Sequence, residues 1–231
     1  MDDVLKITNV LGDQTRYSIY DYLVQHKNEV GVQDIADKFH IHPNVARLHL
    51  SKLEDIHLIQ SYLSKTGKGG RPSRKYKISD KSIQLSFPFR DYQLLAKIAI
   101  ESMAALGEVG KQALYQTGKK FGHEIAQKYF YGQSSSLVSL DRKVDIIKDI
   151  ATSCGLYADF HVRKEEQSIH LAINNCPFKE LVDSEKHSIC HMHLAFLQGI
   201  FEEVLDGATL QEIDNMADGC KQCTYKAFLP N

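Results

Sequence analysis

The stretch His42–Ile59, HPNVARLHLSKLEDIHLI, determines how the rest of the chain is interpreted. Pro43 suits the first turn of a helix, where its missing N–H leaves no hydrogen bond unmade. Apolar residues then recur at helical spacing as Ala46, Leu50 and Leu53. The opposite face is outward and largely polar. The pattern therefore predicts a short amphipathic helix that begins near residue 43.

The outward face of this helix carries side chains that can contact DNA bases: Asn44, Arg47, Leu48 and Ser51. Asn and Arg can each form paired hydrogen bonds with base edges in the major groove. The next residues predict a strand (HLIQSYLS), a loop (SKTGKGGRPSRK) and a returning strand (KYKIS). A helix followed by a basic hairpin is the layout of a winged helix-turn-helix, although a helix and a hairpin also occur in other small α+β domains.

Every charged residue between positions 65 and 77 is basic. Lysine and arginine side chains that neutralise phosphates release counterions, so binding through them is salt-sensitive. Glycines in this loop permit backbone angles that would let it follow a narrow groove. We expect Arg71 and Arg74 at phosphates or in the minor groove, and Lys65 and Lys68 to bind DNA with them.

Three helices are expected before this segment, within residues 4–11, 14–26 and 32–39. Asp13 is a suitable N-cap for the second of them. Arg16, near the start of that helix, either contacts a phosphate or is a solvated surface arginine. The sequence thus predicts a DNA-binding domain over residues 1–80.

Composition limits the remaining interpretations. The chain has 231 residues, which suits two domains, and 43% hydrophobic residues, which is ordinary for a globular core. It has no apolar run long enough to span a membrane, and its start lacks the features of a signal peptide, so we expect a cytoplasmic protein. The formal net charge of −1 does not by itself indicate a nucleic-acid partner.

The second half is expected to form an α+β domain over residues 90–231, joined to the first by a linker at 81–89. Its first helix, within residues 89–106, has an apolar stripe wider than a lone surface helix needs. Because operators with two half-sites call for a two-fold protein, we expect this helix in a homodimer interface; the alternative is burial in its own domain. The stripe contains Leu94, Leu95, Ile98, Ala99 and Met103.

Helical periodicity continues in residues 109–130, with Phe121 expected to point inward, and in residues 141–153 and 191–205. Alternating apolar and polar residues predict a small antiparallel sheet. Its strands are expected in YADFHVRKE, SIHLAINN, TLQEIDNM and CTYKAFL.

All five cysteines lie in this second half of the chain; Cys154 is expected in the core, and the candidate ligands are Cys176, Cys190, Cys220 and Cys223. The last two form a CxxC pair, a spacing that lets two thiolates converge on one metal. Placement of Cys190 at the start of a helix would lower its pKa. Four soft thiolates suit zinc or an iron–sulfur cluster, although free cysteines are often buried as small apolar residues. A nearby histidine (His187, His191 or His193) is a possible substitute for one thiolate.

The N-terminal residues resemble the ArsR/DeoR-like winged-helix regulators. LGDQTRYSIYDYL is similar to their opening helix, and VARLHLSKLEDIHLI to their VxRHLxxLExxGLI signature. On this resemblance Arg47 and His49 occupy the polar positions that read DNA. His57 stands where the family has glycine.

The whole arrangement also resembles the SufR-type regulators of iron–sulfur assembly genes, while LYQTGKKFGHEIA and GCKQC are similar to V4R-like domains. The resemblance implies a repressor whose operator affinity falls when a cluster on Cys176, Cys190 and the terminal cysteines is lost. The closing CxxC departs from the SufR-type pattern, which leaves the cluster type or metal open.

Two other interpretations stay open. A winged-helix regulator with a structural zinc could sense a small organic ligand in an apolar pocket lined by Tyr115, Phe121, Tyr157 and Phe160. A thiol oxidoreductase could use Cys220 and Cys223, but such a redox site normally opens a helix, whereas strands are expected to flank this pair. The sequence also lacks GxSxG, HExxH and P-loop motifs, so we expect no enzyme.

Overall fold

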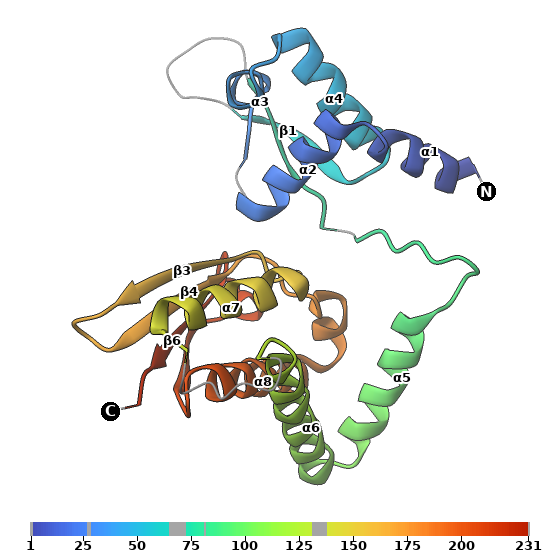
Figure 1. The fold of residues 1–231 in the computed structure, drawn as a ribbon. Coiled ribbons are helices and arrows are strands. Elements are labelled where there is room, and N and C mark those ends of the chain that lie inside the picture. Colours follow the sequence, from blue (N-terminus) through green and yellow to red (C-terminus); the bar gives the residue numbers. More distant parts are fainter. Residues whose placement is uncertain (1, 27–28, 65–72, 81, 131–137, 231) are drawn as a thin grey trace. The chain divides into compact units, whose positions relative to one another are not determined.

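The structure, a computed structural model, describes residues 2–26, 29–64, 73–80, 82–130 and 138–230. The chain divides into two compact units, Met1–Arg90 and Asp91–Asn231 (Figure 1). Together they form a mixed α+β protein with two antiparallel sheets. Among the helices in the described ranges, none is long and apolar enough to cross a membrane.

The described residues of the first unit form four helices, α1 (Asp2–Leu11), α2 (Gln14–His26), α3 (Val32–Phe39) and α4 (Pro43–Asp55). The spacing of apolar residues decides which faces are buried. Ala46, Leu50 and Leu53 of α4 are all fully buried, as their periodicity predicts. They pack in one core with further apolar residues of the unit, among them Ile19, Leu23, Ile35, Ile59 and Tyr76.

A short turn joins α3 to α4 and sets the orientation of α4. His40 adopts a left-handed conformation at the end of α3, with φ 53°. The His42 side chain then accepts a hydrogen bond from the Asn44 N–H, and Pro43 occupies the first turn of α4, as expected. At the far end of α4, His57 has φ 60°, a conformation that glycine adopts at lower cost.

An antiparallel hairpin follows α4, with β1 (Ile59–Ser64) paired to β2 (Ser73–Ile78). Val30 exchanges two backbone hydrogen bonds with Tyr76, of 2.9 and 2.8 Å, and so ties β2 to the segment between α2 and α3. Because the Tyr76 side chain is also buried in the core of the unit, the base of the hairpin is fixed to the helices.

The second unit is built on a four-stranded antiparallel sheet with strand order β3-β4-β6-β5. The strands are β3 (Ala158–Arg163), β4 (Ser168–Ile173), β5 (Thr209–Asp214) and β6 (Cys223–Phe228). They lie within the four segments whose alternation predicts strands. β4 and β6 are the inner strands and bury Ile169, Leu171, Tyr225 and Ala227.

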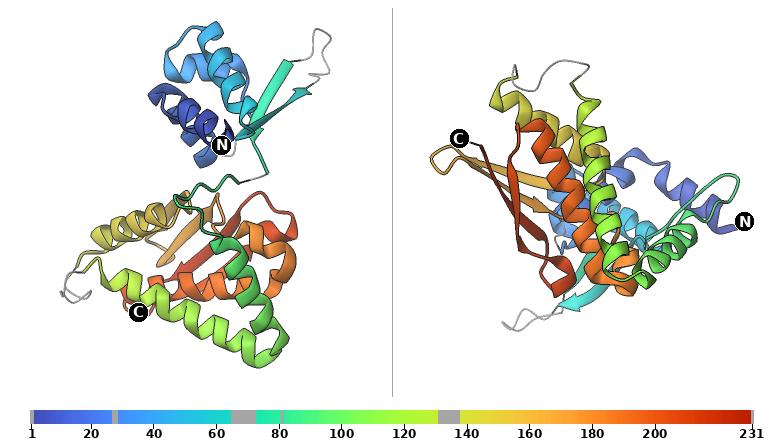
Figure 2. Two further views of the ribbon diagram at one scale, coloured as in Figure 1. Left: turned by 90° about the vertical axis from the view of Figure 1, so that its right-hand side faces the viewer. Right: turned by 90° about the horizontal axis from the view of Figure 1, so that it is seen from below.

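The helices of this unit are α5 (Tyr92–Ala105), α6 (Glu108–Gln127), α7 (Leu140–Ser153) and α8 (Lys179–Val204). In the views of Figures 1 and 2, α6 and α8 run side by side, and α5 lies at the margin beside them. Apolar residues of α7 and α8 form one core with the inner strands, among them Ile147, Ile150, Leu197 and Phe201.

Glycines allow α6 and α8 to approach each other closely. A Cβ atom at Gly122 would lie 2.1 Å from the backbone oxygen of Phe196, and one at Gly199 would lie 2.2 Å from that of Lys119. No side chain fits at either position unless the helices separate. This contact places polar side chains of α6 opposite those of α8.

Two expectations about these helices are wrong. α8 begins at Lys179, not near His191, and continues through a kink at Glu185 with φ −144° and ψ 55°. Its first turns are mostly polar, so the apolar periodicity that marks its second half does not reveal them. Phe121 is 51% exposed instead of pointing inward, because α6 presents its glycines to α8.

Candidate functional site

The outward face of α4 is the first candidate site. Asn44, Arg47 and Leu48 are exposed, and Ser51 is half-buried. The Arg47 guanidinium donates a 3.1 Å hydrogen bond to the Asn44 side-chain oxygen, one turn earlier on the helix. The two side chains that can form paired contacts with base edges therefore lie together on the free face of a helix whose other face is buried.

His49 does not belong to this face. It is only 8% exposed, and its Nδ1 atom lies 3.9 Å from a carboxylate oxygen of Asp13. Burial lowers the pKa of His49; Arg16 also lowers it, and Asp13 opposes them. The expectation that His49 reads DNA therefore disagrees with its position. Its spacing from Ala46 places it on the inward face of α4.

Arg16 is half-buried and links the ends of α1 and α2. Its guanidinium donates a 2.7 Å hydrogen bond to the Val10 carbonyl and lies 3.8 Å from the Asp13 carboxylate. Asp13 also accepts a 2.8 Å hydrogen bond from the Arg16 backbone N–H, which confirms its role as a cap of α2. These contacts hold Arg16 within the unit, so the solvated-surface interpretation does not describe it.

The hairpin places two of its described basic residues beside carboxylates. Arg74 is exposed and lies 4.0 Å from Glu54 of α4, whereas Lys75 forms a 2.9 Å ion pair with Asp34 of α3. The Gly31 backbone N–H and then Lys75 lower the pKa of Asp34. The predicted DNA contacts Lys65, Lys68 and Arg71 lie outside the described residues.

The second candidate site is a group of thiols in the second unit. Cys176 follows β4, Cys190 lies within α8, and Cys223 begins β6. Asn215 joins two of them, because its side-chain oxygen lies 4.0 Å from the Cys190 Sγ and 3.8 Å from the Cys223 Sγ. Cys176 is near enough for the charges of Cys223 and Cys190 to raise its pKa. The fold thus brings three of the four predicted cysteines together.

Burial is the main influence on all three thiols. It raises the pKa of Cys176 to about 11, against a hydrogen bond from the Phe178 backbone N–H. Burial also raises the pKa of Cys190 and of Cys223, although Cys223 accepts a 3.2 Å hydrogen bond from the Met216 backbone N–H. The expectation of a lowered pKa for Cys190 is wrong, because this residue lies inside α8 and not at a helix start.

Cys220 lies apart from this group. It is exposed, in the turn between the 3₁₀ helix Met216–Asp218 and β6, and its backbone N–H donates a 3.4 Å hydrogen bond to the Asn215 carbonyl. The turn is therefore adjacent to the three thiols. Across the described part of the chain, no three His, Cys, Asp or Glu side chains are positioned to hold a metal ion. The donor set suits a soft metal, but these side chains are not arranged around one common centre.

The neighbouring histidines have separate environments. His193 is 4% exposed, and burial lowers its pKa to about 4. It packs against Phe178, with ring centroids 5.2 Å apart, and its Nε2 atom has no hydrogen-bond partner. His187 and His191 are exposed, and their rings stack 5.9 Å apart.

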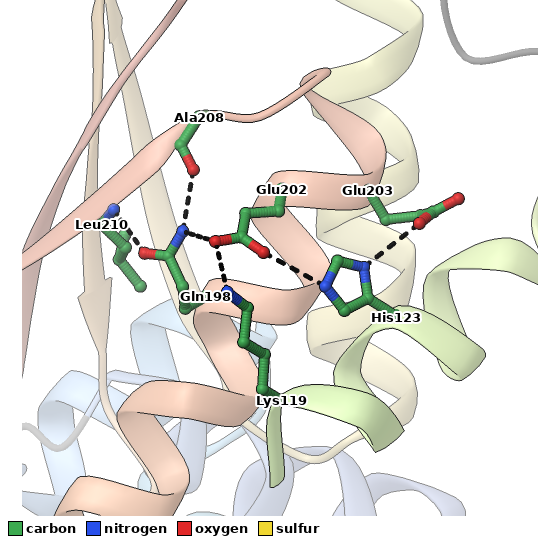
Figure 3. Close-up of polar contacts among 7 residues, drawn as sticks. All are labelled: Lys119, His123, Gln198, Glu202, Glu203, Ala208 and Leu210. Carbon is green, nitrogen blue, oxygen red and sulfur yellow. Dashed lines mark hydrogen bonds and ion pairs between the residues drawn. The ribbon is translucent and has the colours of Figure 1, made fainter. Parts of the chain in front are cut away.

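The close approach of α6 and α8 creates a polar network that the sequence analysis missed (Figure 3). His123 lies between two carboxylates, with Nε2 3.1 Å from Glu202 and Nδ1 3.1 Å from Glu203. Lys119 lies 2.9 Å from Glu202. Gln198 donates to Glu202 and to the Ala208 carbonyl, and it accepts from the Leu210 N–H, so the network reaches β5. The spacing of Gly118 and Gly122 on one helix is the sequence signal that could have indicated this contact.

The residues of the predicted ligand pocket do not share one environment. Tyr115, Tyr157 and Phe160 are half-buried, and Phe121 is exposed. Tyr115 packs against His191, with ring centroids 4.8 Å apart. No contact among these residues favours the ligand interpretation.

Comparison with known proteins adds a family match for the second unit. Residues 116–227 match the family model described as methanogen output domain 1, a V4R-like domain. The match extends from within α6 to β6, includes the four cysteines, and supports the V4R part of the resemblance. No curated protein matches the chain.

Two solved structures show limited similarity. One is trafficking protein particle complex subunit 3 from Naegleria fowleri, covalently bound to palmitic acid, with 16% identity and a TM-score of 0.42 over 60% of this chain and 97% of that one. The other is the phenol-responsive sensory domain of the transcription activator PoxR with phenol, with 13% identity and a TM-score of 0.40 over 78% of this chain and 88% of that one.

Proposed function

We propose that this chain is a non-enzymatic, cytoplasmic transcription regulator whose first unit is a winged helix-turn-helix that binds duplex DNA. The observation that carries the proposal is the pairing of Asn44 with Arg47 on the exposed face of α4. The opposite face of the same helix is fixed in the core, so the helix can enter a groove without losing its packing. The β1–β2 hairpin and its basic loop would then follow the neighbouring backbone.

The second unit would act as the sensor of this regulator. Cys176, Cys190 and Cys223, with Cys220 from the adjacent turn, are the residues that would hold an iron–sulfur cluster or, as the alternative, zinc. Such a group would supply strong sulfur–metal bonds between segments that otherwise meet only through packing and hydrogen bonds. Buried neutral thiols would have to lose their protons on binding, so uptake would be favoured by higher pH.

Control of DNA binding would follow from this linkage. The thiols come from the end of β4, from α8 and from the start of β6, so ligation would restrict how these elements move. A bound group shifts an equilibrium only through different affinities for its two states. We propose that the loaded form binds the operator more tightly and represses transcription, and that the protein does so as a homodimer on two half-sites.

The experiment compares two arginines of the full chain. A duplex is selected by the protein from a random pool, and its affinity is measured by fluorescence anisotropy at several salt concentrations. Arg47→Ala should weaken binding by roughly tenfold to a hundredfold, as expected for loss of a bidentate base contact. Arg163→Ala removes the same charge from an exposed position on β3 and should leave the affinity unchanged.

Two results would contradict the proposal. One is the absence of any duplex binding by the full chain at about 50 mM salt, where phosphate contacts are strong. The other is an equal loss of affinity in both variants, which would mean that only net charge matters.

A further inference from the structure

α5 is the most exposed apolar helix in the described part of the chain. Four of its large side chains face solvent: Leu94 is 53% exposed, Leu95 61%, Ile98 54%, and Leu106, at its C-terminal end, 58%. Only Ile100 of this helix is buried. A helix that is apolar around most of its circumference is normally covered on more than one side. Among the described residues of its own unit, therefore, nothing covers the face opposite Ile100.

The residues of this face are arranged symmetrically about Ile100. Leu94 and Leu106 lie at equal distances before and after it, as do Leu95 and Ala105, and Ile98 and Ser102. At 3.6 residues per turn, all six positions point away from the side on which Ile100 is buried. When this helix is turned end to end, Leu94 and Leu106 exchange places, while the large Leu95 and Ile98 exchange places with the small Ala105 and Ser102.

We propose that the α5 faces of two copies of this chain pack against each other, antiparallel, about a two-fold axis opposite Ile100. In this pairing Leu94 meets Leu106 of the second copy, while the large Leu95 and Ile98 meet the small Ala105 and Ser102. Large side chains opposite small ones allow two helices to interdigitate without voids. A closed two-fold interface uses the same patch on both copies, which is what this face provides.

Polar groups on and beside the face are compatible with pairing. The Ser102 hydroxyl donates a 2.8 Å hydrogen bond to the Ile98 carbonyl of its own helix, so its burial leaves no donor unpaired. Lys97 and Glu101 lie on one flank, 3.8 Å apart. In an antiparallel pair that flank faces its own copy, which brings each lysine near the other glutamate and offsets the proximity of the two glutamates beside the axis.

The size of the surface also fits a second copy. The four large side chains expose roughly 400 Å² of apolar area, comparable with the largest patch on a typical monomer. This exposed area is about half of the ~800 Å² that each partner contributes to a standard interface. The exposed small residues and the flanks of α5 add to it. The inference rests on the homodimer of the proposed function. The test below measures association of the protein without DNA. The α5 pairing can therefore fail while DNA binding holds, and DNA binding can fail while the pairing holds.

The first measurement is sedimentation equilibrium of the full chain at micromolar concentration. The protein should be a dimer, and Ile98→Glu should raise the dimer dissociation constant by about a hundredfold, because it places two carboxylates in the buried contact. Ile213→Glu is the matched control, since Ile213 is 55% exposed but lies on β5. This control should leave the dimer unchanged.

The second measurement tests the antiparallel arrangement. Leu95→Ala and Ala105→Leu should each weaken the dimer, because one leaves a void and the other brings two leucines together. The double variant exchanges the two sizes and should recover most of the lost affinity. Circular dichroism is expected to show the same helix content in all variants, because both positions are exposed.

Three results would overturn the inference. A monomeric full chain would mean that no second copy covers α5. A dimer that tolerates Ile98→Glu would place the interface elsewhere. If the double variant lost as much dimer affinity as Leu95→Ala and Ala105→Leu together, the antiparallel pairing would be excluded.

Discussion

The two units place their candidate functional groups differently. In the first, Asn44 and Arg47 lie on the outside of a helix, and the core beneath them contains almost only apolar side chains. In the second, the thiols and His193 lie partly or wholly inside, among the elements that form the core. In the proposed regulator, the first unit would therefore bind DNA without changing its packing. The second can respond to a chemical change only by changing how its own elements pack.

This difference suits a division between recognition and sensing. A surface that recognises DNA should keep its shape, whereas a sensor needs two packing states of similar free energy. If the comparison holds, small changes inside the second unit should have large effects, and changes at the polar contacts of the first should have small ones.

The largest effect is expected where α6 and α8 meet. Gly122→Ala would place a methyl group 2.1 Å from the Phe196 carbonyl oxygen, so the helices would have to separate. We expect a loss of about 3 kcal/mol or more in the free energy of unfolding, the upper range for overpacked cores. Thermal denaturation would measure it, with Thr117→Ala on the exposed side of α6 as the control. A loss of similar size in both variants would show that the contact is not tightly packed.

The free energy of unfolding should also depend on pH, because a histidine of the second unit is buried. Burial lowers the pKa of His193 from 6.5 to about 4, so the unfolded chain takes up a proton more readily than the folded one. The contribution of neutral His193 to the free energy of unfolding is complete above pH 6.5. It is lost as the pH falls toward 4, and the loss is up to about 3 kcal/mol.

His193→Leu should remove most of this pH dependence in urea titrations at pH 7 and pH 4.5. His187→Leu makes the same chemical change at an exposed position of α8 and should keep it. If the free energy of unfolding changed equally with pH in the wild-type chain and in His193→Leu, the fold would not protect this histidine from protonation.

The smallest effect is expected in the first unit. Asp13→Ala removes the cap of α2 and the carboxylate that faces His49 and Arg16. We expect a loss of about 1 kcal/mol, the usual value for an N-cap. Asp37→Ala, on the exposed side of α3, should change the free energy of unfolding by less than about 0.5 kcal/mol. If Asp13→Ala lowered the free energy of unfolding more than Gly122→Ala does, the first unit would be the more sensitive of the two, contrary to this expectation.

The same difference explains how much of the fold the sequence predicts. α4 is defined by local periodicity, and its buried residues Ala46, Leu50 and Leu53 follow directly from their spacing. The strands of the second unit follow from alternation in the same way. The burial of His49 could also have been predicted from its spacing. Its polar side chain and the family resemblance favoured the outward assignment instead.

Features that depend on contacts between distant segments were not predictable in this way. The polar first turns of α8 have no apolar stripe, so the position of Cys190 inside the helix was missed. The His123 network exists only because Gly122 and Gly199 let two helices meet. The convergence of Cys176, Cys190 and Cys223 was expected from strand and turn positions, but the separation of Cys220 was not.

In the proposed regulator, the thiols of the second unit control DNA binding by the first. The most direct measurement is the affinity of the full chain for its selected duplex, before and after anaerobic reconstitution with iron and sulfide, in the wild-type chain and in Cys190→Ser. We expect at least about tenfold tighter binding by the reconstituted wild-type protein, a coupling of roughly 1.4 kcal/mol, and no such change in Cys190→Ser. Equal affinities before and after reconstitution of a protein that has taken up iron would contradict it.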